Sequence, residues 1–567
     1  MKILLIYPYF IEERLQAEDI RAVPIGLYSV AAVLRDGNED VEIFNWHDMR
    51  DRQALIKETL RQKKPDLIGF STLHANRWGA IEIARIAKAL DPKVTVVLGG
   101  IGATFLWHHF LTHFPEIDFV VRGEGEYPFL NLVRYLESRR QEGPENIKGL
   151  AFRKNGRILR TEDEKLIEDL DKLPVPAKYF EYQHVSSSRG CAWQCRFCGS
   201  PQFWRKKIRF RSPNHFVDEL EMLYRKGVTF FYFSDDTFTM KKKRVIEICR
   251  GIIDRKLQIA WYAISRVNYV DEDMLFWMRK AGCIQISYGI ESGSEEIRNV
   301  LDKHVRTDQI KKAFAMTTKY GILSRAYFIY GAPGETWKTI QETLDLIHEI
   351  KPLSVVFYIL DIFPGTELYR ELKEKSGISD DIWLNKIEGI MYFETAPDLS
   401  KEHILAFGKR LRTEFYENVH AFAGAVRLVD KEELYGFHGD FFSRLAMTFS
   451  HGEYARIDAV REKEDTAERL YRRSLEYGPN HRAYLGLGIV KQKQGDNQES
   501  VQVLSEGLRF FPNSESLNVC LGISYMNLGD RSRALSQFLK FPDSGEAKDY
   551  IVQCRKATGE YNETAEG

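Results

Sequence analysis

Two long stretches of this 567-residue chain alternate short apolar runs with amphipathic segments, and this alternation restricts the fold more than any other feature. In residues 1–140 the apolar runs are KILLIY, VEIFNW, DLIGFS, VTVVLGG and IDFVVRG. In residues 185–400 they are HVSSSRG, VTFFYFSDD, IAWYAIS, CIQISYGIE, SRAYFIYG and SVVFYILDIF. Strands that alternate with helices form parallel sheets covered by those helices. The chain is therefore predicted to be α/β, with a Rossmann-like first domain and a second domain built as a partial (β/α)6 barrel of the TIM type.

The rest of the chain divides into a connection and a helical tail. Residues 141–184 are expected to be a linker, because they contain a Gly-Pro pair, two further prolines and the hairpin-like run FRKNGRIL. Residues 401–450 are expected to be mostly helical. Within residues 451–567, LGLGIVKQKQGD aligns with CLGISYMNLGD, so that corresponding glycines lie 34 residues apart. This period is typical of tetratricopeptide-like helical repeats, and an ordinary all-α domain is the alternative.

Charge and hydropathy exclude several classes of protein. The 81 lysines and arginines balance the 81 aspartates and glutamates, which argues against a nucleic-acid-binding protein. Two basic runs, Arg205–Arg211 and Lys241–Arg244, are expected to be solvated faces. No apolar run reaches the roughly 18 residues that span a bilayer, so no transmembrane segment is predicted. The opening MKILLIYPYF is predicted to be a buried strand rather than a signal peptide, and the protein is expected to be cytoplasmic.

The seven cysteines are unevenly distributed. Cys191, Cys195 and Cys198 form a CxxxCxxC motif on one predicted loop after the first strand of the second series. Three thiolates suit an iron–sulfur cube with one open iron, which can chelate the amino and carboxylate groups of a ligand and deliver an electron. A zinc site would need a fourth ligand, for which His184 and His215 are the candidates. The other cysteines are expected to be buried apolar fillers: Cys249, Cys283, Cys520 and Cys554.

The cysteine loop, with an aromatic residue before its last cysteine, resembles the signature of the radical S-adenosylmethionine (SAM) superfamily, and the resemblance covers about residues 185–370. In that superfamily, groups at successive strand ends contact the amino group, carboxylate, ribose and adenine of SAM. By this resemblance the SAM-contacting residues are Phe197, Asp235, Asp236, Ser265, Arg266, Glu291 and Gly331. Taken singly, each polar group among them could equally be a helix cap or a surface ion pair.

The first domain resembles the cobalamin-binding domain that precedes many radical SAM cores, in PIGLYSVAAVL, GFST, VVLGGIGATF and DFVVRGEGE. Small residues at strand ends let the backbone approach a bulky ligand. The resemblance implies that the cobalamin-binding residues are Ser71, Thr72, Gly99, Gly100, Gly102, Gly123 and Glu124. The DxHxxG motif of cobalamin mutases is missing where YPYFIEE follows the first strand. His74 could face the cobalt, but a surface-loop histidine is the favoured interpretation, and a flavodoxin-like domain without a ligand is the alternative for the whole domain.

Together the two resemblances imply a cobalamin-dependent radical SAM enzyme whose cofactors are a [4Fe–4S] cluster, SAM and cobalamin. Reductive cleavage of SAM would give a 5′-deoxyadenosyl radical that removes hydrogen from an unactivated carbon, and methylcobalamin would supply a methyl group. No side chain need act as a nucleophile, so the cluster and cofactors carry the catalysis.

Three alternatives to a methyltransferase stay open. They are a radical cyclase or C–C coupling enzyme with the same cofactors, a radical SAM enzyme with an empty first domain, and an inert iron–sulfur scaffold whose helical repeats recruit a partner. The expected partners are an organic substrate (a lipid, tetrapyrrole, peptide or natural product), a one-electron reductant protein and a protein bound to the helical repeats.

Overall fold

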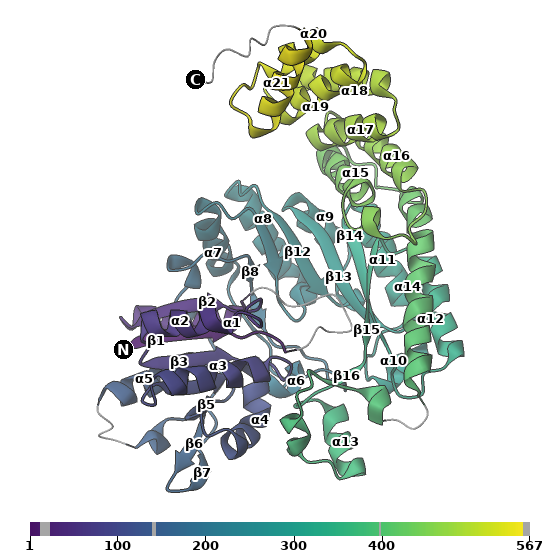
Figure 1. The fold of residues 1–567 in the computed structure, drawn as a ribbon. Helices are drawn as coiled ribbons and strands as arrows, with labels where there is room; N and C mark the ends of the chain where they lie inside the picture. The colour runs from purple at the N-terminus through teal and green to yellow at the C-terminus, as the bar shows by residue number, and fades with distance from the viewer. Residues whose placement is uncertain (12–22, 139–142, 396–398, 559–567) are drawn as a thin grey trace, which may run out of the picture. The chain divides into compact units, whose positions relative to one another are not determined.

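A seven-stranded sheet forms the N-terminal part of the computed structural model, which describes residues 1–11, 23–138, 143–395 and 399–558 (Figure 1). The strand order is β2-β1-β3-β4-β5-β6-β7, and β1 to β5 are parallel. The strands are β1 (Lys2–Tyr7), β2 (Asp40–Asn45), β3 (Leu67–Ser71), β4 (Thr95–Gly99), β5 (Phe119–Val121), β6 (Leu150–Lys154) and β7 (Arg157–Arg160). The helices are α1 (Ile25–Asp36), α2 (Gln53–Lys63), α3 (Arg77–Leu90), α4 (Gly100–His113) and α5 (Glu126–Glu137). The predicted Rossmann-like domain is confirmed.

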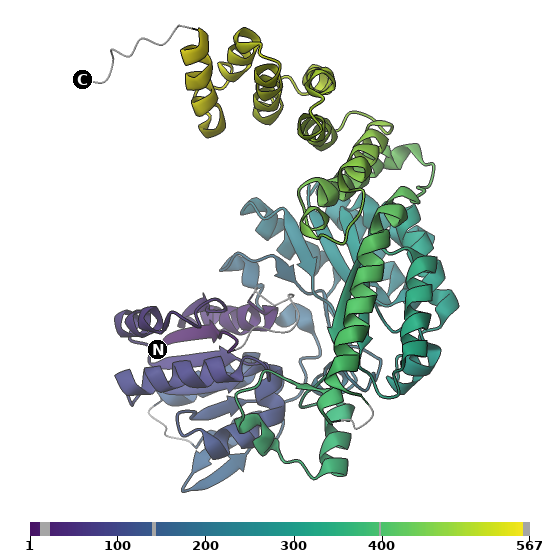
Figure 2. The same ribbon diagram turned by 45° about the vertical axis from the view of Figure 1, so that its right-hand side comes forward.

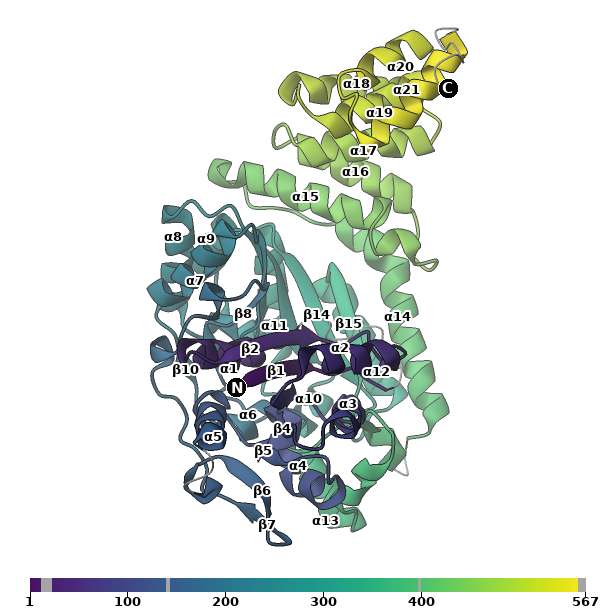
Figure 3. The same cartoon turned by 60° about the vertical axis from the view of Figure 1, so that its left-hand side comes forward.

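Helices cover both faces of this sheet (Figure 3). Along β1, Ile3, Leu5 and Tyr7 belong to a core shared with α1 and α5, whereas Leu4 and Ile6 belong to a second core shared with α2 and α3. Because successive strand residues point to opposite faces, a sheet with two buried faces requires a continuous apolar run. The alternation also brings the carboxyl ends of β1, β3, β4 and β5 to a single edge of the sheet.

A hairpin extends the first sheet beyond its parallel strands. Strand β6 pairs antiparallel with β5, and β6 pairs antiparallel with β7. Asn155 and Gly156 form the turn with φ of 51° and 75°, the left-handed conformations that suit a two-residue hairpin turn. The hairpin expected within the linker is therefore part of the first sheet. Residues 141 and 142 of that linker, and the last two residues of YPYFIEE, lie outside the described residues.

A second, six-stranded sheet has the order β15-β14-β13-β12-β11-β8, so its strands follow one another in space as they do in sequence (Figure 1). The strands are β8 (His184–Val185), β11 (Phe230–Phe233), β12 (Ala260–Ser265), β13 (Cys283–Glu291), β14 (Leu323–Tyr330) and β15 (Ser354–Ile359). The helices between them are α7 (Pro213–Arg225), α8 (Lys242–Asp254), α9 (Glu272–Lys280), α10 (Glu295–Val300), α11 (Thr307–Lys319) and α12 (Trp337–Ile350). Each predicted apolar run of this series contributes one strand to this sheet, and the predicted partial barrel is confirmed.

Two short ribbons flank this second sheet. Strand β9 (Ser188–Arg189) pairs antiparallel with β10 (Arg209–Phe210), and β16 (Asp361–Ile362) pairs with β17 (Ile390–Met391). A short helix α6 (Ser200–Phe203) lies in the loop between β9 and β10, and α13 (Glu367–Ser376) follows β16.

The C-terminal part of the chain is helical, and its helices follow one another as pairs (Figure 2). They are α14 (Lys401–Gly424), α15 (Tyr435–Ser450), α16 (Lys463–Leu475), α17 (His481–Lys493), α18 (Asn497–Phe510), α19 (Glu515–Asn527), α20 (Arg531–Phe538) and α21 (Gly545–Thr558). The N-caps Asn480 and Ser514 lie 34 residues apart, and each accepts a hydrogen bond from the third residue of its helix. The N-caps Asp496 and Asp530 repeat this arrangement at the same spacing. The caps therefore carry the period seen in the sequence.

Contacts divide the chain into two units. One contains Met1–Ile310, Ala326–Leu346 and Val356–Lys409, and the other contains Lys311–Arg325, Ile347–Val355 and Arg410–Gly567, of which residues 559–567 are outside the described part. Most of both sheets and the whole cysteine loop lie in the first unit. Within the described part of the chain, no helix combines the length and the apolar composition that crossing a membrane requires.

Candidate functional site

The cysteine loop is closed at its base by the β9–β10 ribbon. Arg189 pairs with Arg209 across this ribbon, and the three cysteines lie in the loop between them. Gly190 precedes the first cysteine with φ of 98°, and a Cβ there would lie 2.1 Å from the carbonyl oxygen of Lys207. Only glycine fits this close crossing of the two chain segments. The loop therefore begins from a fixed point directly after β9.

Arg196, inside the loop, fastens it to the barrel. Its backbone N–H donates to the carbonyl of Leu301 (3.1 Å), and its own carbonyl accepts from the N–H of Leu368 (3.2 Å). Its guanidinium donates to the carbonyl of Val300 (2.8 Å) and pairs with Glu371. Sequence reasoning missed this residue, because a charged side chain between two cysteines does not reveal partners more than 100 residues away.

The thiols of the loop lie close to one another, with Cys195 buried and Cys191 and Cys198 half-buried. Burial raises the pKa of Cys195, against the opposing effect of Lys303 and Arg266. Burial, with further contributions from Asp236, Cys195 and Cys191, raises the pKa of Cys198 to about 12. Adjacent buried thiolates are stable only beside compensating positive charge, which iron supplies. The donor set therefore fits an iron–sulfur cluster.

The histidines that could complete a zinc site have other partners. His184 Nδ1 lies 3.0 Å from the hydroxyl of Ser234, and its ring stacks on Tyr232. His215 Nδ1 lies 3.3 Å from a carboxylate oxygen of Asp171. Neither histidine contacts the loop thiols among the described residues, so the structure does not support the zinc alternative. The four remaining cysteines, Cys249, Cys283, Cys520 and Cys554, are buried as expected.

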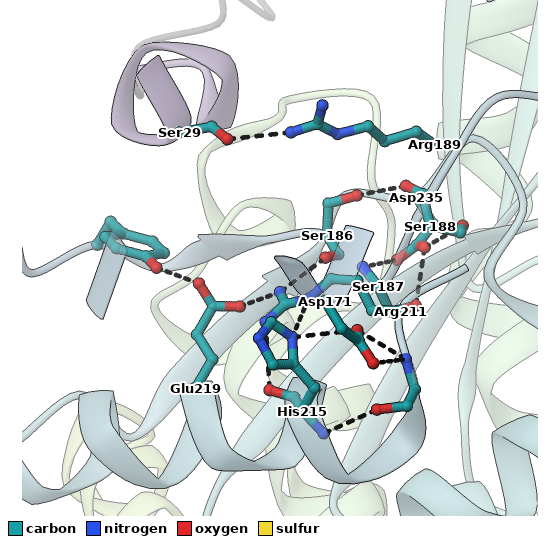
Figure 4. Close-up of polar contacts among 12 residues, drawn as sticks. Ser29, Asp171, Ser186, Ser187, Ser188, Arg189, Arg211, His215, Glu219 and Asp235 are labelled. Carbon is teal, nitrogen blue, oxygen red and sulfur yellow. Dashed lines mark hydrogen bonds and ion pairs between the residues drawn. The ribbon is translucent and has the colours of Figure 1, made fainter. Parts of the chain in front are cut away.

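The two aspartates that follow β11 contact the segment that leads into the cysteine loop, and Figure 4 shows Asp235 beside Ser187 and Ser188. Asp235 is buried and accepts hydrogen bonds from the backbone N–H (3.2 Å) and hydroxyl (2.8 Å) of Ser187, and from the hydroxyl of Ser188. Asp236 accepts a hydrogen bond from the N–H of Gly190 (3.1 Å). Burial raises the pKa of both carboxyls. In this structure the two aspartates therefore brace the entry to the loop.

The predicted SAM residues at the end of β12 contact the loop more directly. The guanidinium of Arg266 lies over the ring of Trp193 at 4.1 Å, and its Nη1 donates to Sγ of Cys195 at 3.7 Å. Arg266 Nε is buried without a hydrogen-bond partner among the described residues. The hydroxyl of Ser265 is hydrogen-bonded to that of Thr239. Arg266 is thus the predicted residue that the structure places against a loop thiol.

Two of the three remaining predicted SAM residues lie at the ends of the next strands, and the third, Phe197, lies in the cysteine loop. Glu291 ends β13 with φ of 71°, a strained conformation for a residue other than glycine, and its Oε1 accepts from Lys303 Nζ at 2.5 Å. Gly331, with φ of 80°, follows β14 and donates its N–H to Glu335. Phe197 packs at the edge of an apolar core that includes residues of β1 and β3, and also Ala332 and Leu360, which follow β14 and β15.

Glu335 is a second residue that sequence reasoning missed. It is buried, and it accepts hydrogen bonds from the backbone N–H groups of Gly331 and Ala332. Burial raises its pKa to about 7, although these two N–H groups oppose the shift. The sequence GAPGET around Glu335 predicts a turn, but it does not reveal the burial that raises the pKa of this residue.

A cavity of about 440 Å³ lies at the carboxyl ends of β3, β4 and β5. Five predicted cobalamin residues line it: Ser71, Gly99, Gly100, Gly123 and Glu124. A Cβ on Gly123 would meet no atom within 4 Å, so its backbone is open to a ligand. Ser188, Ser200 and Asp236 line the same cavity from the side of the cysteine loop. The cavity therefore has the small-residue wall that a bulky cofactor requires, in direct continuity with the loop.

Two predicted cobalamin residues do not line this cavity. The hydroxyl of Thr72 donates to the carbonyl of Gly99 at 2.9 Å. Gly102 lies so close to the backbone of Leu73 that a Cβ would approach its carbonyl carbon to 2.5 Å. Both residues shape the strand ends rather than face the cavity.

A buried ion cluster joins the first domain to the start of the cysteine loop. Arg189 pairs with Glu124 (2.5 Å) and Glu126 (2.6 Å) and also donates to the hydroxyl of Ser29 in α1 (3.0 Å; Figure 4). Arg209 Nη1 pairs with the other oxygen of Glu124 at 2.6 Å. Burial alone would raise the pKa of Glu126, but Arg189 more than offsets this and holds the pKa below its usual value. Glu124, which was predicted to bind cobalamin, thus forms ion pairs with two arginines in this structure.

This cluster corrects the interpretation of the basic runs. Arg205, Lys206 and Lys207 are exposed, as a solvated face would be, but Arg209 and Arg244 are buried. Arg244 donates to the backbone carbonyls of Arg211 and Ser187. Solvated faces are therefore the wrong description at these two positions, because a buried carboxylate and buried carbonyls require their charges.

His74 is not a surface-loop histidine, contrary to expectation. Its side chain is 13% exposed, its Nε2 lies 3.0 Å from Asp361 Oδ2, and its ring stacks on Phe363 with centroids 4.8 Å apart. It does not line the cavity described above.

Known proteins resemble both parts of this site. A radical SAM superfamily model matches residues 185–347, and a B12 binding domain model matches residues 21–133. An uncharacterized methyltransferase of Pyrococcus horikoshii is 32% identical over 381 residues, which are 65% of this chain and 82% of that protein. The chain belongs to the cobalamin-binding radical SAM family. This membership confirms that the chain is an enzyme whose cofactors are a [4Fe–4S] cluster, SAM and cobalamin, and it confirms the predicted class, a cobalamin-dependent radical SAM methyltransferase, at the level of the family.

Two further comparisons define the range of the family. The anaerobic magnesium-protoporphyrin IX monomethyl ester cyclase of Rubrivivax gelatinosus is 32% identical over 353 residues, which are 59% of this chain and 63% of the cyclase. The cobalamin-dependent SAM radical enzyme OxsB matches with a TM-score of 0.54 at 17% identity, over 99% of this chain and 84% of its own. The similarity to OxsB concerns the fold alone.

The ion cluster makes a direct prediction for stability. Glu124→Gln keeps the size of the side chain but leaves the buried Arg209 facing a neutral group and Arg189 paired with Glu126 alone. Breaking a buried pair in this way is expected to lower the free energy of unfolding by about 3–5 kcal/mol. Glu168→Gln is the matched control, because Glu168 is 75% exposed and its contact with Lys207 is long (3.4 Å). Urea unfolding of both variants makes the comparison, and equal stabilities would contradict the role assigned to the cluster.

Glu335 makes a prediction for pH dependence. Its folded-state pKa of about 7 lies above the usual 4.5, so the buried neutral acid stabilises the fold fully below pH 4.5. This stabilisation is lost as the pH rises toward and through 7. Glu335→Gln stays neutral, so between about pH 5 and about pH 8 wild type is expected to lose roughly 1–3 kcal/mol relative to this variant. Urea unfolding at both pH values is the measurement, with the exposed Glu374→Gln as control. Parallel pH profiles for wild type and Glu335→Gln would contradict the assignment.

Proposed function

We propose that this enzyme transfers a methyl group from SAM to an unactivated carbon of an organic substrate by radical chemistry. The substrate is a lipid, tetrapyrrole, peptide or natural product, and a one-electron reductant protein supplies electrons. The observation that carries the proposal is the cavity that Ser71, Gly99 and Gly123 line from the first domain and Ser188 and Asp236 line from the loop side. The naming of the Pyrococcus relative as a methyltransferase supports the choice of reaction.

In this proposal Cys191, Cys195 and Cys198 hold the cluster, which when bound supplies one electron to SAM. Arg196 holds the loop on the barrel through two backbone hydrogen bonds, a hydrogen bond from its guanidinium to the carbonyl of Val300, and its pair with Glu371. Arg266, beside Cys195, places positive charge next to the thiolates. The chain therefore acts by fixing positions and by excluding water from the reacting groups.

The predicted SAM residues take two roles in the proposal. Arg266 and Glu291, which Lys303 links through its backbone carbonyl and its ammonium group, are the groups that would face SAM from β12 and β13. The others shape or brace the site: Phe197, Asp235, Asp236, Ser265 and Gly331. Ser71, Thr72, Gly99, Gly100, Gly102 and Gly123 are the residues proposed to make room for cobalamin, and Glu124 orients the strand end that carries Gly123.

The proposal also assigns the parts of the chain. They are a cobalamin-binding domain (1–140), a linker with a hairpin (141–184), a radical SAM core (185–400), a helical extension (401–450) and tetratricopeptide-like repeats (451–567). The recurrence of the helix caps at 34 residues supports the repeats, whose helix pairs would bind a protein. A cytoplasmic location completes the proposal, supported by seven cysteines that form no disulfide.

A second candidate is a radical cyclase or C–C coupling enzyme that uses the same cofactors. The 32% identity to the Rubrivivax cyclase favours it, since this value equals the identity to the Pyrococcus methyltransferase. Both reactions would use the same cavity and loop, so products distinguish them better than geometry does.

The test uses anaerobically prepared, cluster-reconstituted full-length protein supplied with cobalamin, SAM carrying a labelled methyl group and a strong one-electron reductant. We expect both 5′-deoxyadenosine and S-adenosylhomocysteine, and we expect Cys195→Ala to abolish 5′-deoxyadenosine. Cys249→Ala is the matched control, because Cys249 is buried in α8, outside the loop. The methyl-transfer proposal fails if 5′-deoxyadenosine forms but S-adenosylhomocysteine does not, in the presence of candidate substrates. The absence of both products would contradict the proposal that this protein cleaves SAM.

A further inference from the structure

Three potential metal ligands meet away from the site described above. His109 and His113 lie one turn apart in α4, and Asp381 follows α13 in a short turn (Asp380–Leu384). The ligand atoms of the three side chains all lie within 4.8 Å of one another. His113 Nε2 is 2.8 Å from Asp381 Oδ1. None of the three lines the cavity beside the cysteine loop.

His109 is the residue that points to a ligand. It is 3% exposed, and both ring nitrogens are buried without a hydrogen-bond partner among the described residues. Its neighbours include the rings of Phe110 and Phe114, which offer neither a hydrogen-bond donor nor an acceptor. A buried polar group without a partner costs about 1–3 kcal/mol, so an imidazole with two such nitrogens requires an explanation.

We propose that His109, His113 and Asp381 bind a divalent first-row metal ion, with Zn²⁺ the best fit. Histidines four residues apart on a helix present their rings on one face, which is the arrangement zinc sites use. Two nitrogens and one carboxylate oxygen form a donor set suited to Zn²⁺, with water as a fourth ligand. Donors in a tetrahedral site lie about 3.3 Å apart, so side-chain shifts of the order of 1 Å would close the set.

Of the neighbouring Asp380 and Asp381, only Asp381 has a carboxylate placed to bind the metal with His109 and His113. Asp380 is already engaged, because its Oδ1 accepts from the Tyr369 hydroxyl (2.8 Å) and from Lys373 (3.0 Å). Arg77, the nearby cation, directs its guanidinium to backbone carbonyls, including those of Trp383 and Asn385. Burial lowers the pKa of His109 to about 4, which keeps the ring in the neutral form that ligates metals.

The ion would join two segments that are 268 residues apart in sequence. One is α4 of the first domain, and the other is the turn that carries the buried Trp383 and follows the barrel. Because the ligands belong to separate segments, binding would stabilise their packing against each other.

The test measures Zn²⁺ binding by full-length protein in which Cys191, Cys195 and Cys198 are all replaced by serine, so that the loop thiols cannot bind the probe. We expect one tight equivalent of Zn²⁺ by competition with a chromophoric chelator. His113→Gln and Asp381→Asn are each expected to weaken binding at least tenfold. His108→Gln is the matched control, since His108 is exposed on the same helix and should leave binding unchanged. X-ray absorption should show nitrogen and oxygen neighbours only.

A second measurement does not depend on the folding of the variant that lacks Cys191, Cys195 and Cys198. In cluster-loaded protein with intact cysteines, Zn²⁺ should raise Tm, and this increase should disappear in Asp381→Asn. The proposal is overturned if no tight equivalent of Zn²⁺ binds. It is also overturned if adding His113→Gln or Asp381→Asn to the protein with the three serine replacements leaves the affinity for Zn²⁺ unchanged. The same holds if Zn²⁺ raises the Tm of Asp381→Asn as much as that of wild type.

Discussion

The arrangement of the site depends on the buried ion cluster formed by Arg189, Arg209, Glu124 and Glu126. Charges taken out of water are tolerated only in a geometry that satisfies each of them, so the cluster permits one placement of the segments that carry it. Glu124 lies between β5 and α5 and Glu126 is the first residue of α5, while Arg189 and Arg209 pair across the base of the cysteine loop. The cluster therefore holds the carboxyl edge of the first sheet against the beginning of the loop, and the cavity lies at this junction.

A site built this way suits chemistry that the cofactors perform and the protein controls. The loop is fixed at its base by the β9–β10 ribbon and in its interior by the hydrogen bonds of Arg196, so the three thiols have little freedom to move. Arg266 supplies positive charge beside Cys195. Radical reactions require that solvent and side reactions be excluded, and the residues of both domains that line the cavity would contribute to this once the cofactors are bound.

The fold could be predicted from the sequence because its causes are local. Apolar runs bounded by turn residues specify strands, amphipathic segments specify the covering helices, and closely spaced cysteines must share a loop. The partners of the polar residues could not be predicted in the same way. Glu124 meets Arg189 and Arg209 across 65 and 85 residues, and no spacing rule states which carboxylate faces which guanidinium. The basic run around Arg209 was misinterpreted for this reason, as was His74, whose partner Asp361 lies 287 residues away.

The cavity next to the cysteine loop is proposed to hold cobalamin, and the loop itself is proposed to hold the cluster through different residues. This proposal is tested most directly by counting cobalt and iron per chain in anaerobically reconstituted protein after gel filtration. The account predicts one cobalamin and about four irons per wild-type chain, the content of one [4Fe–4S] cluster. In Cys195→Ala it predicts that the iron is lost while the cobalamin is retained. A wild-type chain that keeps its iron but retains no cobalamin would contradict the proposal.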